Sequence, residues 1–77
     1  MKLEIGQLII DTTGGCLDTG VVIEIREDPY GDDVYHIYWV CPRNRNGLGK
    51  DYTTTLAYTE EELDMEYSHC FEVIPLK

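Results

Sequence analysis

The sequence predicts a small all-β domain, a five-stranded antiparallel barrel with a short helical turn before the last strand. Residues 20–26 and residues 34–40 are rich in β-branched and aromatic side chains, and a stretch rich in Pro, Gly and Asp separates them. Such a pair of segments is typical of a β-hairpin. The 77 residues leave room for one domain, residues 1–77, that buries roughly 60% of the surface of its unfolded chain.

The first two strands are predicted from apolar runs. Residues 3–10 are apolar apart from a few positions, and Gly6 predicts a bend or bulge within that strand. Residues 11–19 contain a glycine pair and predict a loop. In residues 20–26, Val21, Ile23 and Ile25 share one face and Val22, Glu24 and Arg26 share the other. A period of two predicts that Val21, Ile23 and Ile25 face the core.

The third strand, residues 34–40, carries apolar or aromatic side chains on both faces, which predicts a central or covered strand. Ile37 and Trp39 are predicted to complete the core. Two interpretations remain open for the tyrosines. They either pack on neighbouring strands, or Tyr30, Tyr35 and Tyr38 form an aromatic surface that recognises a partner.

The last third of the chain predicts a strand, a helical turn and a final strand. Residues 52–58 alternate in β fashion. Thr59 followed by Glu62 is a capping box, which predicts one or two helical turns. Leu63 and Tyr67 are four residues apart and are expected to share the inward face of those turns. Residues 70–74 predict the last strand, and the expected core comprises Leu8, Ile10, Val21, Ile23, Ile25, Ile37, Trp39, Leu56, Leu63, Phe71 and Val73.

The charge of the chain argues against nucleic-acid and membrane binding. Fifteen acidic and six basic residues give a net charge of −9, and a surface of that sign repels phosphate. No apolar run approaches the ~20 residues of a membrane span, and no secretory signal is recognised. These features predict a cytoplasmic protein.

The residues capable of metal binding or catalysis show no familiar spacing. Cys16, Cys41 and Cys70 are odd in number and far apart, which argues against a disulfide framework and for a reducing compartment. No zinc spacing occurs, and the four carboxylates of residues 27–33 do not match a calcium loop. We therefore predict no metal and no cofactor. No nucleophile, base and orienting group are recognisably arranged, which predicts a protein that is not an enzyme.

Four segments together resemble a known family. GQLI at residues 6–9, GVVIEI at 20–25, YHIYW at 35–39 and YTEEEL at 58–63 are similar to the small SH3-like barrel proteins of tailed phages, particularly marine ones. The pattern is more distantly similar to KOW and Tudor-like modules. The resemblance implies an SH3-like barrel and a role as an accessory or structural protein, in the host cytoplasm or the virion. The loop of residues 42–50 is longer than is typical of that family.

Two functions from different classes follow. The first is a non-enzymatic interaction module that binds a protein partner or copies of itself. The second is an acidic mimic of nucleic acid that inhibits a host protein, which requires the acids of residues 27–33 and 60–66 to form one face.

The loop of residues 42–50 is the predicted contact element. It holds Arg43, Arg45 and Lys50, half of the basic residues, and no acid. Such a loop would dock on an acidic surface of a partner or a second subunit. The alternative is a solvated hairpin tip whose charges keep the chain soluble.

Overall fold

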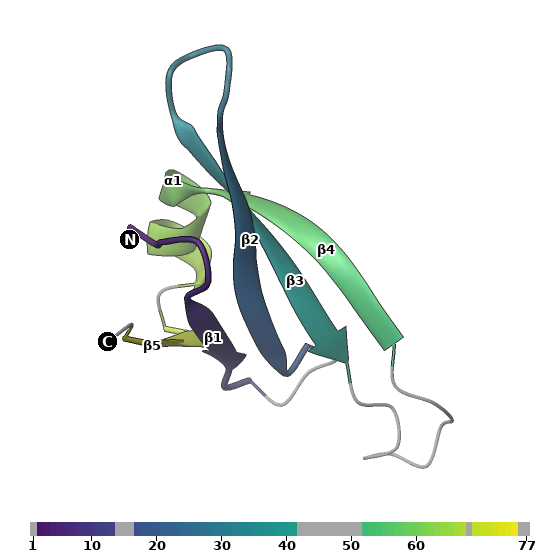
Figure 1. The fold of residues 1–77 in the computed structure, drawn as a ribbon. Coiled ribbons are helices and arrows are strands. Elements are labelled where there is room, and N and C mark those ends of the chain that lie inside the picture. Colours follow the sequence, from purple (N-terminus) through teal and green to yellow (C-terminus); the bar gives the residue numbers. More distant parts are fainter. Residues whose placement is uncertain (1, 14–16, 42–51, 68, 76–77) are drawn as a thin grey trace.

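The computed structural model describes residues 2–13, 17–41, 52–67 and 69–75 of the chain. Five antiparallel strands form one sheet with the strand order β4-β3-β2-β1-β5 (Figure 1). The strands are β1 (Leu8–Asp11), β2 (Thr19–Glu27), β3 (Asp33–Cys41), β4 (Tyr52–Thr59) and β5 (Phe71–Ile74). A helical segment, α1 (Glu60–Glu62) and the π-helical turn η2 (Leu63–Tyr67), precedes β5. The predicted all-β class, the five strands and the helical turn before the last strand are confirmed.

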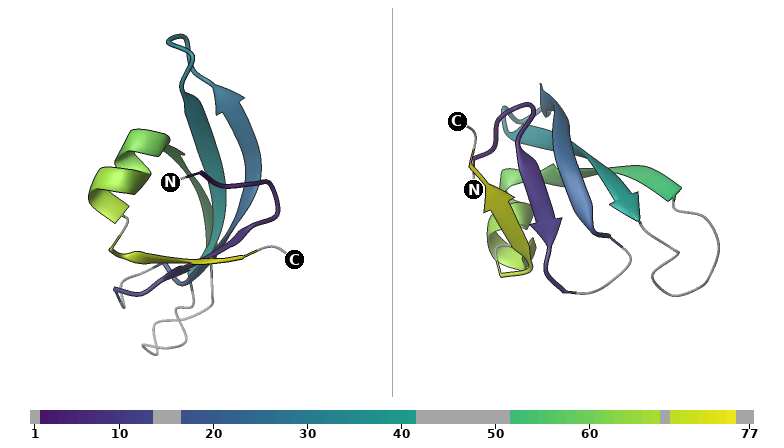
Figure 2. Two further views of the ribbon diagram at one scale, coloured as in Figure 1. Left: turned by 90° about the vertical axis from the view of Figure 1, so that its left-hand side faces the viewer. Right: turned by 60° about the horizontal axis from the view of Figure 1, so that its bottom comes forward.

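The sheet is strongly curved. The helical segment lies beside its concave side, between the end of β4 and the start of β5 (Figure 2). Among the described residues no pairing joins β4 to β5, so these strands are the two edges of the sheet. Closure into a barrel therefore stays a prediction. None of the helices in the described ranges has the length and hydrophobicity of a membrane span.

Gly6 makes the bend that the sequence predicts. Its φ angle is +90°, a backbone conformation that residues with a Cβ rarely adopt. On either side of this bend, the Gly6 N–H donates to the Val22 carbonyl (2.7 Å) and the Val22 N–H donates to the Gln7 carbonyl (3.0 Å). The entering segment is thereby attached to β2, and the strand itself begins later than predicted, at Leu8.

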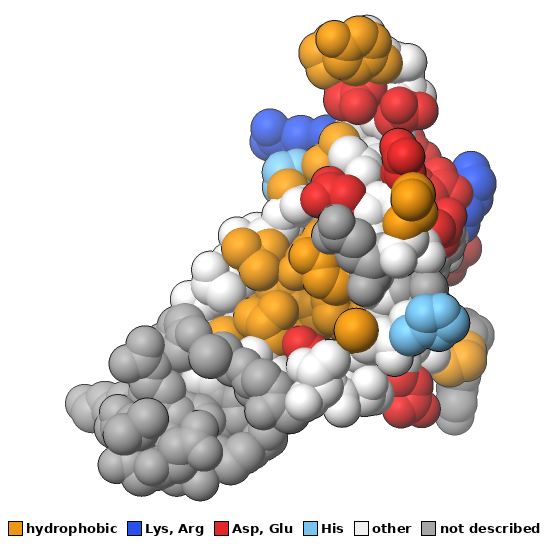
Figure 3. Space-filling view, turned by 180° about the vertical axis from the view of Figure 1, so that it is seen from behind, with side chains coloured by type: hydrophobic (Ala, Val, Ile, Leu, Met, Phe, Trp, Pro, Cys, Tyr) orange, Lys and Arg blue, Asp and Glu red, His pale blue; other side chains and the backbone are white. Residues whose placement is uncertain are grey.

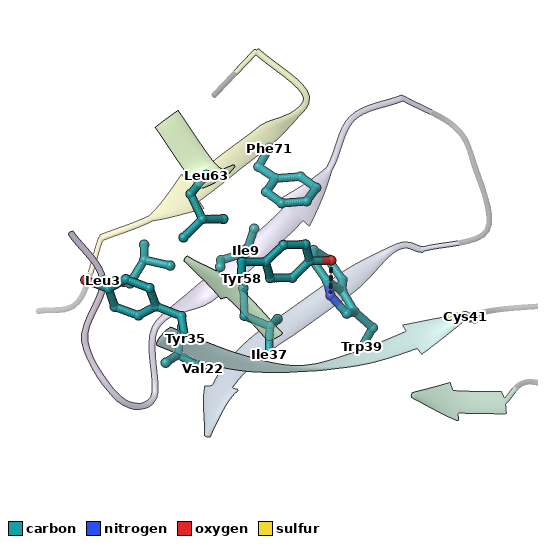
Figure 4. Packing of buried hydrophobic residues seen from close by; sticks show 10 residues of the cluster. All are labelled: Leu3, Ile9, Val22, Tyr35, Ile37, Trp39, Cys41, Tyr58, Leu63 and Phe71. Atoms are coloured by element: carbon teal, nitrogen blue, oxygen red, sulfur yellow. Dashed lines mark hydrogen bonds between the residues drawn. The ribbon is translucent and has the colours of Figure 1, made fainter. Parts of the chain in front are cut away.

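The core lies on the concave side of the sheet (Figure 4). Trp39 is fully buried in it, with its ring centroid 5.2 Å from that of Phe71. The Trp39 indole N–H donates a hydrogen bond to the Tyr58 hydroxyl oxygen (3.2 Å), so the buried indole is paired. Buried hydrophobic residues of the described part of the chain are Leu3, Ile9, Val22, Tyr35, Ile37, Trp39, Cys41, Tyr58, Leu63 and Phe71. Ile37, Trp39, Leu63 and Phe71 confirm the predicted core, and Ile25 and Val73 pack against it.

The predicted inward face of the first strand is wrong. Ile9 is buried, whereas Leu8 is 44% exposed and Ile10 is half-buried. The reason is the register: Ile9 pairs with Gly20, and Gly20 pairs with Trp39 on the concave side. A Cβ at position 20 would lie 2.7 Å from Ile37 Cγ2 and 2.8 Å from the Trp39 ring, so the indole packs directly over the glycine backbone.

A β-bulge explains the error in the second strand. Val22 is buried, Ile23 is 47% exposed and Val21 is half-buried, contrary to the prediction. The register between β2 and β3 shifts between Val22 and Glu24. The extra residue lets Val22 and Ile25, which are three apart, both face the core.

In β4 the predicted core residue Leu56 is 39% exposed, whereas Tyr58 is buried. Both side chains lie on the same face of the strand, but only Tyr58 is covered by the core.

The predicted capping box is present and starts the helical segment. The Thr59 hydroxyl accepts a hydrogen bond from the Glu62 N–H (3.1 Å), and the Thr59 N–H donates to Glu62 Oε1 (3.0 Å). Leu63 is buried and Tyr67 packs against the core, as their spacing predicts.

Candidate functional site: two hollows at the junction of β4 and α1

Two hollows take part of their lining from the segment where β4 ends and α1 begins. Leu56, Ala57 and Tyr58 line the first hollow, which has a volume of about 390 Å³. The next three residues along the chain, Thr59, Glu60 and Glu61, line the second, of about 260 Å³. A short run of consecutive residues therefore contributes to both. Figure 3 shows hydrophobic side chains gathered in the middle of this face and acidic ones grouped toward the β2–β3 hairpin.

The first hollow is mainly apolar. Three of the aromatic rings in its walls contact each other. Tyr67 and Phe71 stack with their ring centroids 4.9 Å apart, and the Tyr58 ring packs edge-on against the Tyr67 ring with a centroid distance of 5.1 Å. These contacts hold the wall in one arrangement. The apolar lining residues are Leu17, Leu56, Ala57, Tyr58, Tyr67, Cys70 and Phe71.

The polar groups around this hollow are acidic or neutral. Asp11, Thr13 and Glu62 complete its described lining, which includes no Lys, Arg or His. Asp11 is already engaged, since its Oδ1 accepts hydrogen bonds from the Thr13 N–H (2.8 Å) and hydroxyl (2.6 Å). Such a surface suits apolar side chains with neutral or positively charged neighbours.

Tyr58 is held in its neutral form. Burial raises the pKa of the Tyr58 phenol above its ordinary value of 10.0 and outweighs the hydrogen bond from Trp39, which lowers that pKa. Tyr67 and the Asp11 and Glu62 carboxylates raise it further. A neutral phenol paired with a buried indole is a structural element of the hollow's wall rather than a base.

The second hollow is lined by carboxylates. Asp28 and Asp32 come from the β2–β3 hairpin, and Glu60 and Glu61 come from α1. Asp28 also closes the hairpin, because its Oδ1 accepts hydrogen bonds from the Tyr30 and Asp32 N–H groups, each 2.9 Å long. No group of metal-ligating side chains is found within the described ranges. The hollow thus joins the two acidic segments that lie about thirty residues apart in the sequence.

The predicted aromatic surface is not one surface. Tyr35 is 1% exposed, because it shares the inward face of β3 with Ile37 and Trp39. Its ring is therefore absent from the surface, which corrects the prediction. Tyr30 is 90% exposed in the β2–β3 hairpin, and Tyr38 is 39% exposed on the convex side of β3. Tyr38 pairs with Val21, which pairs with Leu8, so it belongs to an apolar row across the outside of the sheet.

The predicted basic contacts, Arg43, Arg45 and Lys50, lie outside the described residues. Sequence reasoning missed Tyr58 and Tyr67 as the walls of a hollow, although it placed both on their elements. The available signal was the capping box, which requires the chain to turn immediately after Tyr58 and brings Tyr67 back toward it.

Fold and site together define a small all-β domain with an apolar hollow and an acid-lined one, to which consecutive residues contribute. The chain matches no protein-family model, and comparisons with the curated proteins and with the solved structures give no match either.

Proposed function

We propose that this protein is a non-enzymatic interaction module, built as an SH3-like barrel, that binds a basic segment of a partner protein. The observation that carries the proposal is the continuous run of residues from Leu56 to Glu61, which lines an apolar hollow and then an acid-lined one. The strand order, with the helical segment before β5, supports the SH3-like part of the proposal.

The chemistry of the surface selects the partner. An apolar hollow desolvates apolar side chains and supplies affinity, whereas the neighbouring carboxylates favour Lys or Arg and disfavour acids. The net charge of −9 adds long-range attraction for a basic chain and accelerates association at low salt. Exposed ion pairs contribute only about 0–1 kcal/mol each, so the acidic side chains contribute more to the choice of partner than to the binding affinity.

Selection from a random displayed-peptide library tests this proposal. We expect the wild-type protein to enrich peptides that combine Lys or Arg with apolar residues. The double variant Glu60→Gln and Glu61→Gln should lose the preference for Lys and Arg, while Glu4→Gln with Glu72→Gln, the same charge change at two exposed positions elsewhere, should keep it. An absence of enrichment, or enriched peptides without positive charge, would refute the proposal.

A second candidate is the acidic mimic of nucleic acid. It is supported by the acid-lined hollow, in which Asp28 and Asp32 meet Glu60 and Glu61 from the other acidic segment. A mimic occupies the nucleic-acid site of its partner, so duplex DNA should release a captured partner in proportion to the DNA concentration. Retention of the partner at saturating DNA would exclude the mimic and favour the interaction module.

A further inference from the structure

The two edges of the sheet differ in how well they are protected from pairing. Natural edge strands are commonly blunted by short length, charged residues or proline. β5 has only four residues, carries Glu72 and is followed by Pro75. β4 has eight residues, Tyr-Thr-Thr-Thr-Leu-Ala-Tyr-Thr, with no charge, no proline and no glycine. Within the described ranges β4 pairs with β3 alone, so one of its edges is unpaired. That edge is long and has neither a charged residue nor a proline to prevent pairing.

We propose that an extended, basic segment of a partner protein adds to the edge of β4 as a further antiparallel strand. Strand addition of this kind takes its affinity from backbone hydrogen bonds and its specificity from the hollows that receive alternate side chains. The inference rests on the proposed function and specifies the binding mode and the chemistry of the partner.

The apolar hollow lies where the side chains of an added strand would project. Neighbouring strands are about 4.8 Å apart, and directly opposed side chains have Cβ atoms about 5 Å apart. Alternate residues of the added strand would therefore lie beside Leu56 and Tyr58 on the concave side, over the hollow that these residues line. Those residues of the partner should be apolar.

Charge determines the direction and the identity of the occupant. In an antiparallel pair, the N-terminal half of the added strand lies beside the Thr59 end of β4. The acid-lined hollow, with Asp28, Asp32 and Glu61, is at that end. Basic residues are therefore expected in the N-terminal half of the segment. A second copy of the chain carries the same net charge of −9, which disfavours it as the occupant.

Backbone-methylated peptides test the inference. The probe is a fluorescent derivative of acetyl-Lys-Thr-Lys-Thr-Val-Thr-Val-Thr-amide, with binding measured by anisotropy. In an extended peptide, the N–H groups of alternate residues point to the same edge. One version is therefore N-methylated along one edge, and a second version along the other edge. We expect one version to bind at least about tenfold more weakly and the other to bind as the parent does, because only one edge pairs with β4. The reversed sequence, with its lysines at the C-terminal end, should bind several-fold more weakly.

Protein variants locate the contact. Leu56→Lys, in β4 at the hollow, should reduce parent-peptide binding about tenfold. Val40→Lys, a charge change at a convex-side residue of nearly equal exposure (37% against 39%), should have little effect, with both variants first checked by thermal melting. Equal binding of the two methylated peptides, or equal effects of the two variants, would overturn strand addition while the proposed function stands. Failure of the parent peptide to bind would also overturn strand addition. The proposed function fails only if the library selection enriches no basic peptides.

Discussion

Trp39 is the residue on which the core depends most. Its side chain is fully buried, its ring contacts Phe71, and its indole N–H is paired with the Tyr58 hydroxyl. The absence of a Cβ at Gly20 allows the ring to lie against the β2 backbone. An interior packed this closely does not collapse readily around a missing side chain.

Replacing Trp39 by Ala should cost roughly 3–5 kcal/mol, which is a large part of the stability of a domain of this size. Thermal or urea denaturation measures the loss. Tyr38→Ala, at the preceding residue of β3, which is partly exposed on the convex side, should cost much less. A Trp39→Ala protein with an unchanged melting temperature would contradict the inward register of β3.

Tyr58→Phe should destabilise the protein by about 1–3 kcal/mol, because the buried Trp39 N–H loses its hydrogen-bond acceptor. It should also change the response to alkali. The pKa of Tyr58 is raised in the folded state, so its contribution to stability is complete below the ordinary value of 10.0 and is lost as the pH rises through the folded-state pKa.

Urea denaturation near neutral pH and above pH 10 tests both effects. The wild-type protein should lose stability with rising pH, and the part of that loss due to Tyr58 should be absent from Tyr58→Phe. Parallel pH profiles for the two proteins would show that the phenol is not buried in its neutral form.

At the scale of elements, the bulge in β2 and the register of β1 decide which side chains reach the core. Residues 8–10 and 21–23 are runs of three apolar residues, so alternation alone fits either face. The position of Gly20 beneath Trp39 selects one face, and the shift between Val22 and Glu24 then brings Ile25 back toward the core. These choices depend on contacts between strands, which no single strand encodes.

The capping box should be worth about 0.5–2 kcal/mol to the helical segment. Thr59→Ala removes the acceptor for the Glu62 N–H and should lower the free energy of unfolding by that amount. Thr55→Ala, at an exposed position of β4, is the matched control and should have a smaller effect. Equal losses in urea denaturation would argue that Thr59 acts only as a strand residue.

At the scale of the whole molecule, charge is distributed unevenly along the chain. Residues 42–50 hold three basic residues and no acid, whereas the remainder holds all fifteen acids. The sequence prediction is that residues 42–50 of one copy contact the acidic surface of another, with these charges setting orientation and association rate more than affinity.

Changing Arg43, Arg45 and Lys50 together to Ser should leave folding intact and weaken self-association in a salt-sensitive way. Sedimentation at low and high salt is the measurement. Changing Lys2, Arg26 and Lys77 to Ser alters the net charge equally and should preserve the association. If both triple variants and the wild type sediment alike at either salt concentration, residues 42–50 have no role in self-association.

Local patterns in the sequence were sufficient to predict the strands, the bend at Gly6, the capping box and the shared face of Leu63 and Tyr67. Each depends on residues a few positions apart, whose steric and hydrogen-bonding preferences act within one element.

The core side of β1 and β2, the burial of Tyr35 and the two hollows were decided by the tertiary structure. The acid-lined hollow needs the β2–β3 hairpin to approach α1, and the apolar hollow needs Tyr58 to meet Tyr67 and Phe71. Such contacts join distant segments through strand register and sheet curvature, both set by packing across the whole sheet. Residue types alone therefore predicted the local elements, while the fold determined which side chains are buried and which lie together.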